Sequence, residues 1–188
     1  MKRHSCIIAA LFLGLPAWAA SVPGIENFYQ VDQQVYRGAQ PTEQGFHYLS
    51  TLGVKTVIDL REHDRRSVAE ERWATAAGMR YVNVPMTGMT PPTTAEISRI
   101  LALMEDSASG PIFVHCKRGA DRTGAVIASY RIVHDHWDNS RALQEAMSDK
   151  MSGFQHQRQN YIRAFQPSTQ AVSADASAAA AAATEDKN

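Results

Sequence analysis

The sequence predicts an α/β fold with a largely parallel central sheet that is flanked by helices. Three observations lead to this prediction. Strand-like and helix-like segments alternate along the chain, which is typical of parallel sheets whose strands are joined by helices. The most continuously apolar strand, Pro111–His115, runs directly into a short loop and a helix, as the central strand of such a sheet does. About 140 residues lie between the two chain ends, enough for one domain with one core.

The first half of the domain is expected to contain two helices and two strands. Thr42–Leu52 has a helical pattern, and the apolar segment Val54–Leu60 follows it as a strand. Ser67-Val-Ala-Glu70 matches a capping box, so the second helix is expected to begin there and to stop at Gly78. Arg80–Val84 is the next strand.

The second half is expected to begin with a Pro/Thr-rich loop that ends at Pro92. Thr93-Thr-Ala-Glu96 is a second capping box and predicts the start of a helix over Ile97–Met104. After the strand Pro111–His115, three helices complete the domain: Thr123–His136, Ser140–Lys150 and Gln155–Phe165.

The two chain ends are expected to lie outside the domain, which leaves residues 20–167 for the fold. Lys2 and Arg3 precede a short apolar core, and Ala17-Trp18-Ala19 fits a cleavage site, so residues 1–19 are predicted to be a signal peptide. The mature protein is therefore expected in the periplasm or outside the cell. The apolar core is too short to span a bilayer and no second one follows, so no integral membrane segment is expected in the mature chain. Residues 168–188 are Ala/Ser-rich and are predicted to be a disordered tail.

Charge and cysteine content narrow the function. The chain has 19 basic and 19 acidic residues. Loss of Lys2 and Arg3 leaves a mature net charge of about −2, so no nucleic-acid surface is expected. The mature chain keeps a single cysteine, Cys116. Because a lone thiol is a liability in an oxidising compartment, we expect Cys116 to act chemically.

The segment from Cys116 to Gly124 reads Cys-Lys-Arg-Gly-Ala-Asp-Arg-Thr-Gly and carries the chemical signal. The five residues between Cys116 and Arg122 let the loop curl so that its backbone N–H groups converge on a phosphate dianion. The next helix directs its positive N-terminal end at the same point, where a cysteine thiolate is favoured. Cys116 is thus the expected nucleophile, and the planar fork of Arg122 is expected to clamp two phosphoryl oxygens.

The other residues of this segment are expected to form or support the phosphate-binding loop. Gly119 allows positive φ and close approach to the ligand. The amides of Ala120 and Gly124 belong to the cradle, and the Thr123 hydroxyl can stabilise the sulfur as a leaving group. Lys117 and Arg118 add two charges at the rim, where they raise phosphate affinity or recognise multiply phosphorylated ligands. Two further expectations concern the surroundings: His115 is a buried hydrogen-bonding partner that tunes Cys116, and Arg37 and Arg61 form structural ion pairs.

With Val35-Tyr-Arg-Gly-Ala-Gln-Pro41 and Leu52–Arg61, this segment resembles the atypical dual-specificity phosphatases within the protein tyrosine phosphatase family. The signal peptide and Tyr130-Arg-Ile-Val133 are most similar to periplasmic bacterial tyrosine phosphatases implicated in biofilm control. The resemblance covers about residues 25–150. It implies a cysteine-phosphatase fold, no metal or other cofactor, and activity on phosphotyrosine in proteins, with phosphoserine and phosphothreonine as further options.

One departure from that family concerns the general acid. The family usually places an Asp on the loop before the cysteine-bearing strand, but the corresponding residues 85–94 contain no carboxylate. Asp121 is the alternative candidate, because myotubularin-like lipid phosphatases have an Asp at this loop position. Its other possible role is to brace the loop by accepting hydrogen bonds. Without an acid, phenolic leaving groups depart far more readily than alkoxides, which favours aryl phosphates.

Three other functions stay open on the sequence. Lys117, Arg118 and Asp121 are compatible with an inositol phosphate or phosphoinositide phosphatase. A rhodanese-like sulfurtransferase also places a cysteine in an amide-lined loop, although the complete spacing from Cys116 to Arg122 disfavours it. The missing upstream Asp allows a non-enzymatic phosphate-binding module.

Overall fold

The computed structural model describes residues 22–167 and confirms the predicted α/β fold with a mostly parallel sheet. The sheet order is β1-β2-β5-β3-β4, in which only the short β1 is antiparallel to its neighbour. The strands are β1 Tyr29–Gln30, β2 Val35–Ala39, β3 Thr56–Asp59, β4 Arg80–Asn83 and β5 Ile112–Cys116. The helices are α1 Glu43–Thr51, α2 Arg65–Ala76, α3 Thr94–Glu105, α4 Asp121–His134, α5 Asn139–Ser148 and α6 His156–Ala164. The predicted ends, residues 1–19 and 168–188, lie outside the described residues.

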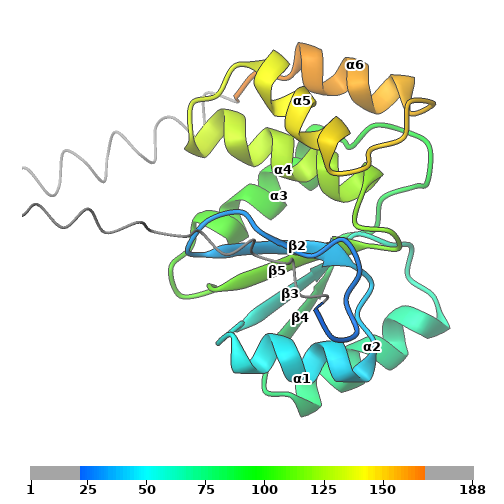
Figure 1. The fold of residues 1–188 in the computed structure, drawn as a ribbon, viewed down its shortest axis with the longest axis vertical. Coiled ribbons are helices and arrows are strands. Elements are labelled where there is room, and N and C mark those ends of the chain that lie inside the picture. The colour runs from blue at the N-terminus through cyan, green and yellow to red at the C-terminus, as the bar shows by residue number, and fades with distance from the viewer. Residues whose placement is uncertain (1–21, 168–188) are drawn as a thin grey trace, which may run out of the picture.

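The helices form a layer on each face of the sheet (Figure 1). Helices α1 and α2 cover one face, where Phe46 and Leu49 pack with Val57 and Phe113. Helices α3 and α4 cover the other face, and α5 and α6 pack on α4 from outside. Ten of the 14 residues of α4 are buried, because it lies between the sheet and this outer pair. The start of α4 is therefore held rigidly against the sheet.

Most elements match the sequence prediction, but the strands β1 and β2 were missed and one helix cap was predicted wrongly. All five residues of β2 are buried. Helix α2 does not begin at a Ser67 cap: Asp64 is the N-cap, and its carboxylate accepts from the N–H groups of Arg66 and Ser67. Glu70, the supposed partner in that box, is instead fully buried beneath the sheet's central strand.

The capping box at Thr93 and Glu96 is confirmed, with Glu96 accepting from the Thr93 N–H at 2.6 Å. Within residues 22–167, no helix combines the length and apolar character needed to cross a bilayer.

Candidate active site

Cys116 is the last residue of the central strand β5, and the loop after it leads directly into α4 (Figure 1). It is the free cysteine of the described part of the chain and is 3% exposed. Ala120 precedes α4 and makes no side-chain cap, so the first N–H groups of the helix receive no side-chain acceptor from it. Exposed N–H groups at a helix start attract anions. Cys116 thus lies where the sequence placed it, at the carboxyl end of the central strand.

The surroundings of Cys116 favour its thiolate. Burial raises the pKa of the thiol, but the Thr123 side chain, the N–H groups of Thr123 and Arg118, and the charge of Arg122 outweigh burial. The net pKa is therefore lowered. The Thr123 hydroxyl is buried, and it has no hydrogen bond of ordinary geometry within residues 22–167. It is thus available to donate to a thiolate at Cys116.

Arg122 is anchored by one end of its guanidinium. Nη1 donates to the carbonyl of Met86 at 3.1 Å and to the Glu62 carboxylate at 3.2 Å, with a longer contact of 3.4 Å to the Leu60 carbonyl. The side chain is mostly buried, which fixes its direction beside Cys116. Sequence reasoning missed Glu62, since nothing in its local pattern links it to a residue 60 positions away.

Gly119 has the positive φ expected for the turn, at 65°. A Cβ at this position would lie 2.3 Å from the backbone carbon of Gly38 in β2, so no side chain fits. The Gly119 carbonyl accepts from Arg37 at 2.6 Å and from Asn27 at 2.9 Å. Arg37 also pairs with Asp149 at 2.7 Å, which confirms that it is a structural ion-pair former. The loop is therefore tied to β2 and to the N-terminal arm of the domain.

Asp121 has partners on both of its carboxylate oxygens. One oxygen accepts the Ser152 N–H at 2.8 Å, and the other forms an ion pair with Arg118. Lys117 is exposed, and Arg118 lies at the surface despite this pair. Both cations are therefore at the rim, as expected. Asp121 links the loop to the segment between α5 and α6, an arrangement that suits the bracing role.

His115 is fully buried behind Cys116 in an ionic cluster. Its Nε2 lies 2.8 Å from the Glu70 carboxylate, within ion-pair distance but without aligned hydrogen-bond geometry. Burial lowers the pKa of His115, but the charges of Glu70 and Asp59 outweigh burial, so the pKa is raised. Arg61 donates to both carboxylates, confirming it as a structural ion-pair former. Asp59, Glu70 and His115 bring ligand atoms within 4.8 Å of one another, but Arg61 already supplies their counter-charge.

The loop after β4, residues 85–93, lies against the site without contributing a carboxylate. It is held from α6 by Arg158, which is fully buried and donates to the carbonyls of Thr87 at 2.6 Å and Gly88 at 2.7 Å. Sequence reasoning missed Arg158, because a lone arginine on a helix carries no local signal of a contact 70 residues away.

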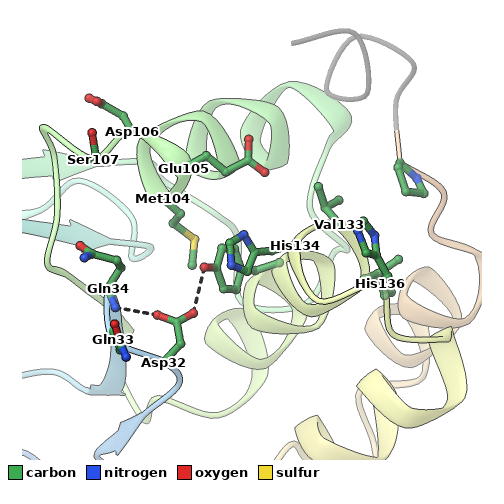
Figure 2. Close-up of a pocket in the computed structure, with 13 residues that line it drawn as sticks. Asp32, Gln33, Gln34, Met104, Glu105, Asp106, Ser107, Val133, His134 and His136 are labelled. Carbon is green, nitrogen blue, oxygen red and sulfur yellow. Dashed lines mark hydrogen bonds between the residues drawn. The ribbon is translucent and has the colours of Figure 1, made fainter. Parts of the chain in front are cut away.

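A separate cavity of about 830 Å³ opens at the opposite end of the sheet (Figure 2). It is lined by the turn before β2, including Asp32 and Gln34, and by the ends of α3 and α4, including Met104 and His134. Asp32 accepts from the Gln34 N–H at 2.7 Å and from the Tyr130 hydroxyl at 2.9 Å. None of the predicted site residues lines this cavity.

The chain is similar to known phosphatases over most of its length. The dual specificity protein phosphatase TpbA of Pseudomonas aeruginosa strain UCBPP-PA14 is 35% identical over 130 residues, which are 69% of this chain and 57% of TpbA. The inositol diphosphatase DSP3 of Arabidopsis thaliana is 28% identical over 145 residues, covering 74% of this chain and 70% of that protein. The chain thus spans little more than half of the length of TpbA.

Solved structures agree with this similarity. The crystal structure of P. aeruginosa TpbA matches with a TM-score of 0.65 and 32% identity, covering 80% of this chain and 92% of that one. The catalytic core of the PP-IP phosphatase SIW14 of S. cerevisiae matches with a TM-score of 0.70 over 78% of this chain and 89% of that one. Its identity of 24% supports the fold alone. Residues 17–164 match the family described as DSP-PTPase phosphatase fused to NAD+ kinase. Together with the fold and the cysteine loop, this match shows that the chain belongs to that family of dual-specificity-type cysteine phosphatases.

Proposed function

We propose that the protein is a cysteine-dependent phosphatase that hydrolyses phosphate monoesters through a cysteinyl-phosphate intermediate. The observation that carries this proposal is the position of Cys116. It lies at the end of the central strand and the start of α4, with a lowered pKa and with Arg122 anchored beside it. A thiolate in such a site is a nucleophile at neutral pH.

The first chemical step transfers the phosphoryl group. The Cys116 thiolate attacks phosphorus, the S–P bond forms, and the P–O bond to the leaving group breaks. The amides of the loop from Lys117 to Gly124 and the fork of Arg122 stabilise the charge on the equatorial oxygens. The leaving oxygen takes a proton from an acid or departs as an anion.

The second step regenerates the enzyme. Water attacks phosphorus, the S–P bond breaks, and the sulfur leaves as a thiolate, while the water proton passes to solvent or to the phosphate formed. The buried Thr123 hydroxyl supports this step, because it can donate to the departing sulfur.

We infer phosphotyrosine in proteins as the main substrate, with phosphoserine and phosphothreonine as further substrates. Residues 85–93 carry no carboxylate, and both oxygens of Asp121 are engaged. The other carboxylate beside the site, Glu62, is paired with Arg122. A site whose carboxylates are held in ion pairs favours phenolic leaving groups over alkoxides. The relative TpbA is described as a dual specificity protein phosphatase, and its structure has been solved in complex with phosphotyrosine.

Inositol phosphates are the second candidate. Lys117 is exposed at the rim beside Arg118, and two cations there suit a ligand with several phosphates. Two relatives from Arabidopsis thaliana, 28% and 32% identical, are described as inositol diphosphatases.

A phosphate-release panel separates these functions. Purified protein is assayed with p-nitrophenyl phosphate, phosphotyrosyl and phosphoseryl peptides, and inositol hexakisphosphate, with Cys116→Ser as the control. Highest kcat/KM on the phosphotyrosyl peptide supports the main proposal, and highest kcat/KM on the inositol ligand supports the second. No release from any substrate refutes phosphatase function, and thiosulfate turnover would then favour sulfurtransferase chemistry.

We also propose that the protein acts in the periplasm or outside the cell, on the basis of the basic residues, apolar core and Ala-x-Ala site at residues 1–19. N-terminal sequencing of the protein recovered from cell fractions tests this. A mature chain that begins at Ala20 in the periplasmic or secreted fraction supports the proposal, and an intact Met1 in the cytosol contradicts it.

A further inference from the structure

Arg158 is a buried guanidinium that the proposed mechanism does not use. It projects from the first turn of α6, and the residue is 0% exposed. None of the ion pairs found within residues 22–167 involves it. Buried charges are normally paired, because removing an ion from water is costly unless an opposite charge compensates. Among the described residues Arg158 therefore has no carboxylate within ion-pair distance, and the negative charges that act on it lie farther away.

The contacts of Arg158 lead toward the catalytic loop. Nη2 donates to the Thr87 carbonyl at 2.6 Å, and Nη1 donates to the Gly88 carbonyl at 2.7 Å. The next residue back along that loop, Met86, accepts from Arg122 at 3.1 Å. Nη1 of Arg158 also donates to Gln155 at 2.5 Å, which fixes the guanidinium on its own helix. A continuous set of contacts thus runs from α6 through residues 86–88 to Arg122.

Arg158 also lies within the electrostatic field of the site. Burial lowers its pKa first and the positive charge of Arg122 lowers it further, while Asp121, Cys116 and Glu62 act in the opposite direction. The buried Nε of Arg158 has no hydrogen-bond acceptor within the described chain. A cation in this position attracts a thiolate and a phosphate dianion, so the substrate itself is a suitable counter-charge.

We propose that Arg158 is a positioning residue of the phosphatase site. It fixes residues 86–88 so that Arg122 is held for phosphate, and it adds positive potential where the phosphate binds. This inference rests on the proposed function. It assigns to the loop after β4, which lacks the carboxylate usual in the family, the task of holding Arg122 in place.

The charge of Arg158 can be tested separately from the pair of hydrogen bonds that its guanidinium donates to Thr87 and Gly88. Arg158→Gln removes the charge, and Arg158→Lys keeps a charge but cannot hold two carbonyls in the same way. Arg163→Gln on the same helix is the matched control, since Arg163 is exposed and, within residues 22–167, forms a side-chain hydrogen bond only with Asn160. Each variant is first checked for wild-type circular dichroism.

Two measurements are made at a series of pH values. The first is kcat/KM for p-nitrophenyl phosphate. The second is the rate of iodoacetamide alkylation of the peptide that contains Cys116, which reports the thiolate without requiring turnover. Every other charged or titratable group near Cys116 is unchanged in these variants. These groups are Arg37, Asp59, Glu62, Glu70, His115, Lys117, Arg118, Asp121 and Arg122.

Arg158→Gln should lower kcat/KM by about 10- to 100-fold, because it removes charge-assisted hydrogen bonds to the loop. It should also move the alkylation profile to higher pH, because a positive charge near the thiolate is lost. Arg158→Lys should lower kcat/KM with a smaller displacement of that profile, and Arg163→Gln should behave as wild type. A folded Arg158→Gln protein within twofold of wild type in both measurements overturns the inference. If the Gln variant does not fold, wild-type kcat/KM in the Lys variant overturns it. Failure of the wild-type protein to hydrolyse any phosphate ester would instead refute the proposed function.

Discussion

Replacing Asp121 by Asn tests whether this residue braces the loop or protonates the leaving group. The change preserves shape and retains an oxygen that can accept the Ser152 N–H, now at 2.8 Å. It removes the ion pair with Arg118, whose side chain is 64% exposed. Pairs of this exposure contribute about 1 kcal/mol or less. The bracing role therefore predicts a loss of no more than about fivefold in kcat/KM, and the same loss for every substrate.

A general acid predicts a different pattern. Its removal slows substrates with poor leaving groups by about 10²–10⁴-fold, while p-nitrophenyl phosphate is little affected. The assay is kcat/KM of wild type and Asp121→Asn over aryl phosphates whose phenols span a range of pKa values. We expect parallel lines in a plot of log kcat/KM against the pKa of the leaving phenol, because both Asp121 oxygens are engaged. A loss that grows steadily with this pKa would refute the reasoning and establish Asp121 as the acid.

Three further predictions concern the nucleophile, the turn and the buried cluster. Cys116→Ser should abolish turnover with the fold retained, and hydrolysis by this mutant within tenfold of the wild-type rate would contradict covalent catalysis. Peroxide should inactivate the wild-type enzyme, and a thiol reductant should restore its activity. Gly119→Ala should lower the free energy of unfolding in urea by about 2–5 kcal/mol. Gly78 also has positive φ, but a Cβ there would meet open space, so Gly78→Ala should lower this free energy by about 1–2 kcal/mol. Equal losses would contradict the close contact between Gly119 and the β2 backbone. Since the pKa of His115 is raised in the fold, its ion pair with Glu70 stabilises fully below about pH 6.5, and this stabilisation is lost as pH rises through the folded pKa. Glu70→Gln should weaken this pH dependence of urea unfolding, with Asp59 maintaining the rest, and an unchanged slope would contradict the assignment.

The site was predictable where its signal is local. Cys116, Gly119 and Arg122 lie within seven consecutive residues that end β5, form the loop and begin α4, so their chemistry identified the phosphate-binding site. The carboxyl end of β5 followed from the apolar run before Cys116. Each of these features depends on residues that are close together in the chain. Backbone geometry and turn chemistry act over this short range.

The features that were missed depend on distant partners. The strand β2 contains Arg37, which is a poor strand signal. Its burial is compensated by partners 82 and 112 residues further along the chain, Gly119 and Asp149. The false cap at Ser67 arose because its spacing to Glu70 fits a capping box, whereas His115 and Arg61 are the actual partners of that glutamate.

The N-terminal arm of the domain has a practical consequence for engineering this protein. The Asn27 side chain reaches the carbonyls of Gly119 and Asp149, at 2.9 and 3.2 Å. The Gly24 carbonyl accepts from Thr42, which caps α1. Truncation past Gly24, or an affinity tag fused directly at Asn27, would break these hydrogen bonds between the N-terminal residues and the catalytic loop. Purification handles belong at the other terminus or ahead of Val22 with a flexible spacer.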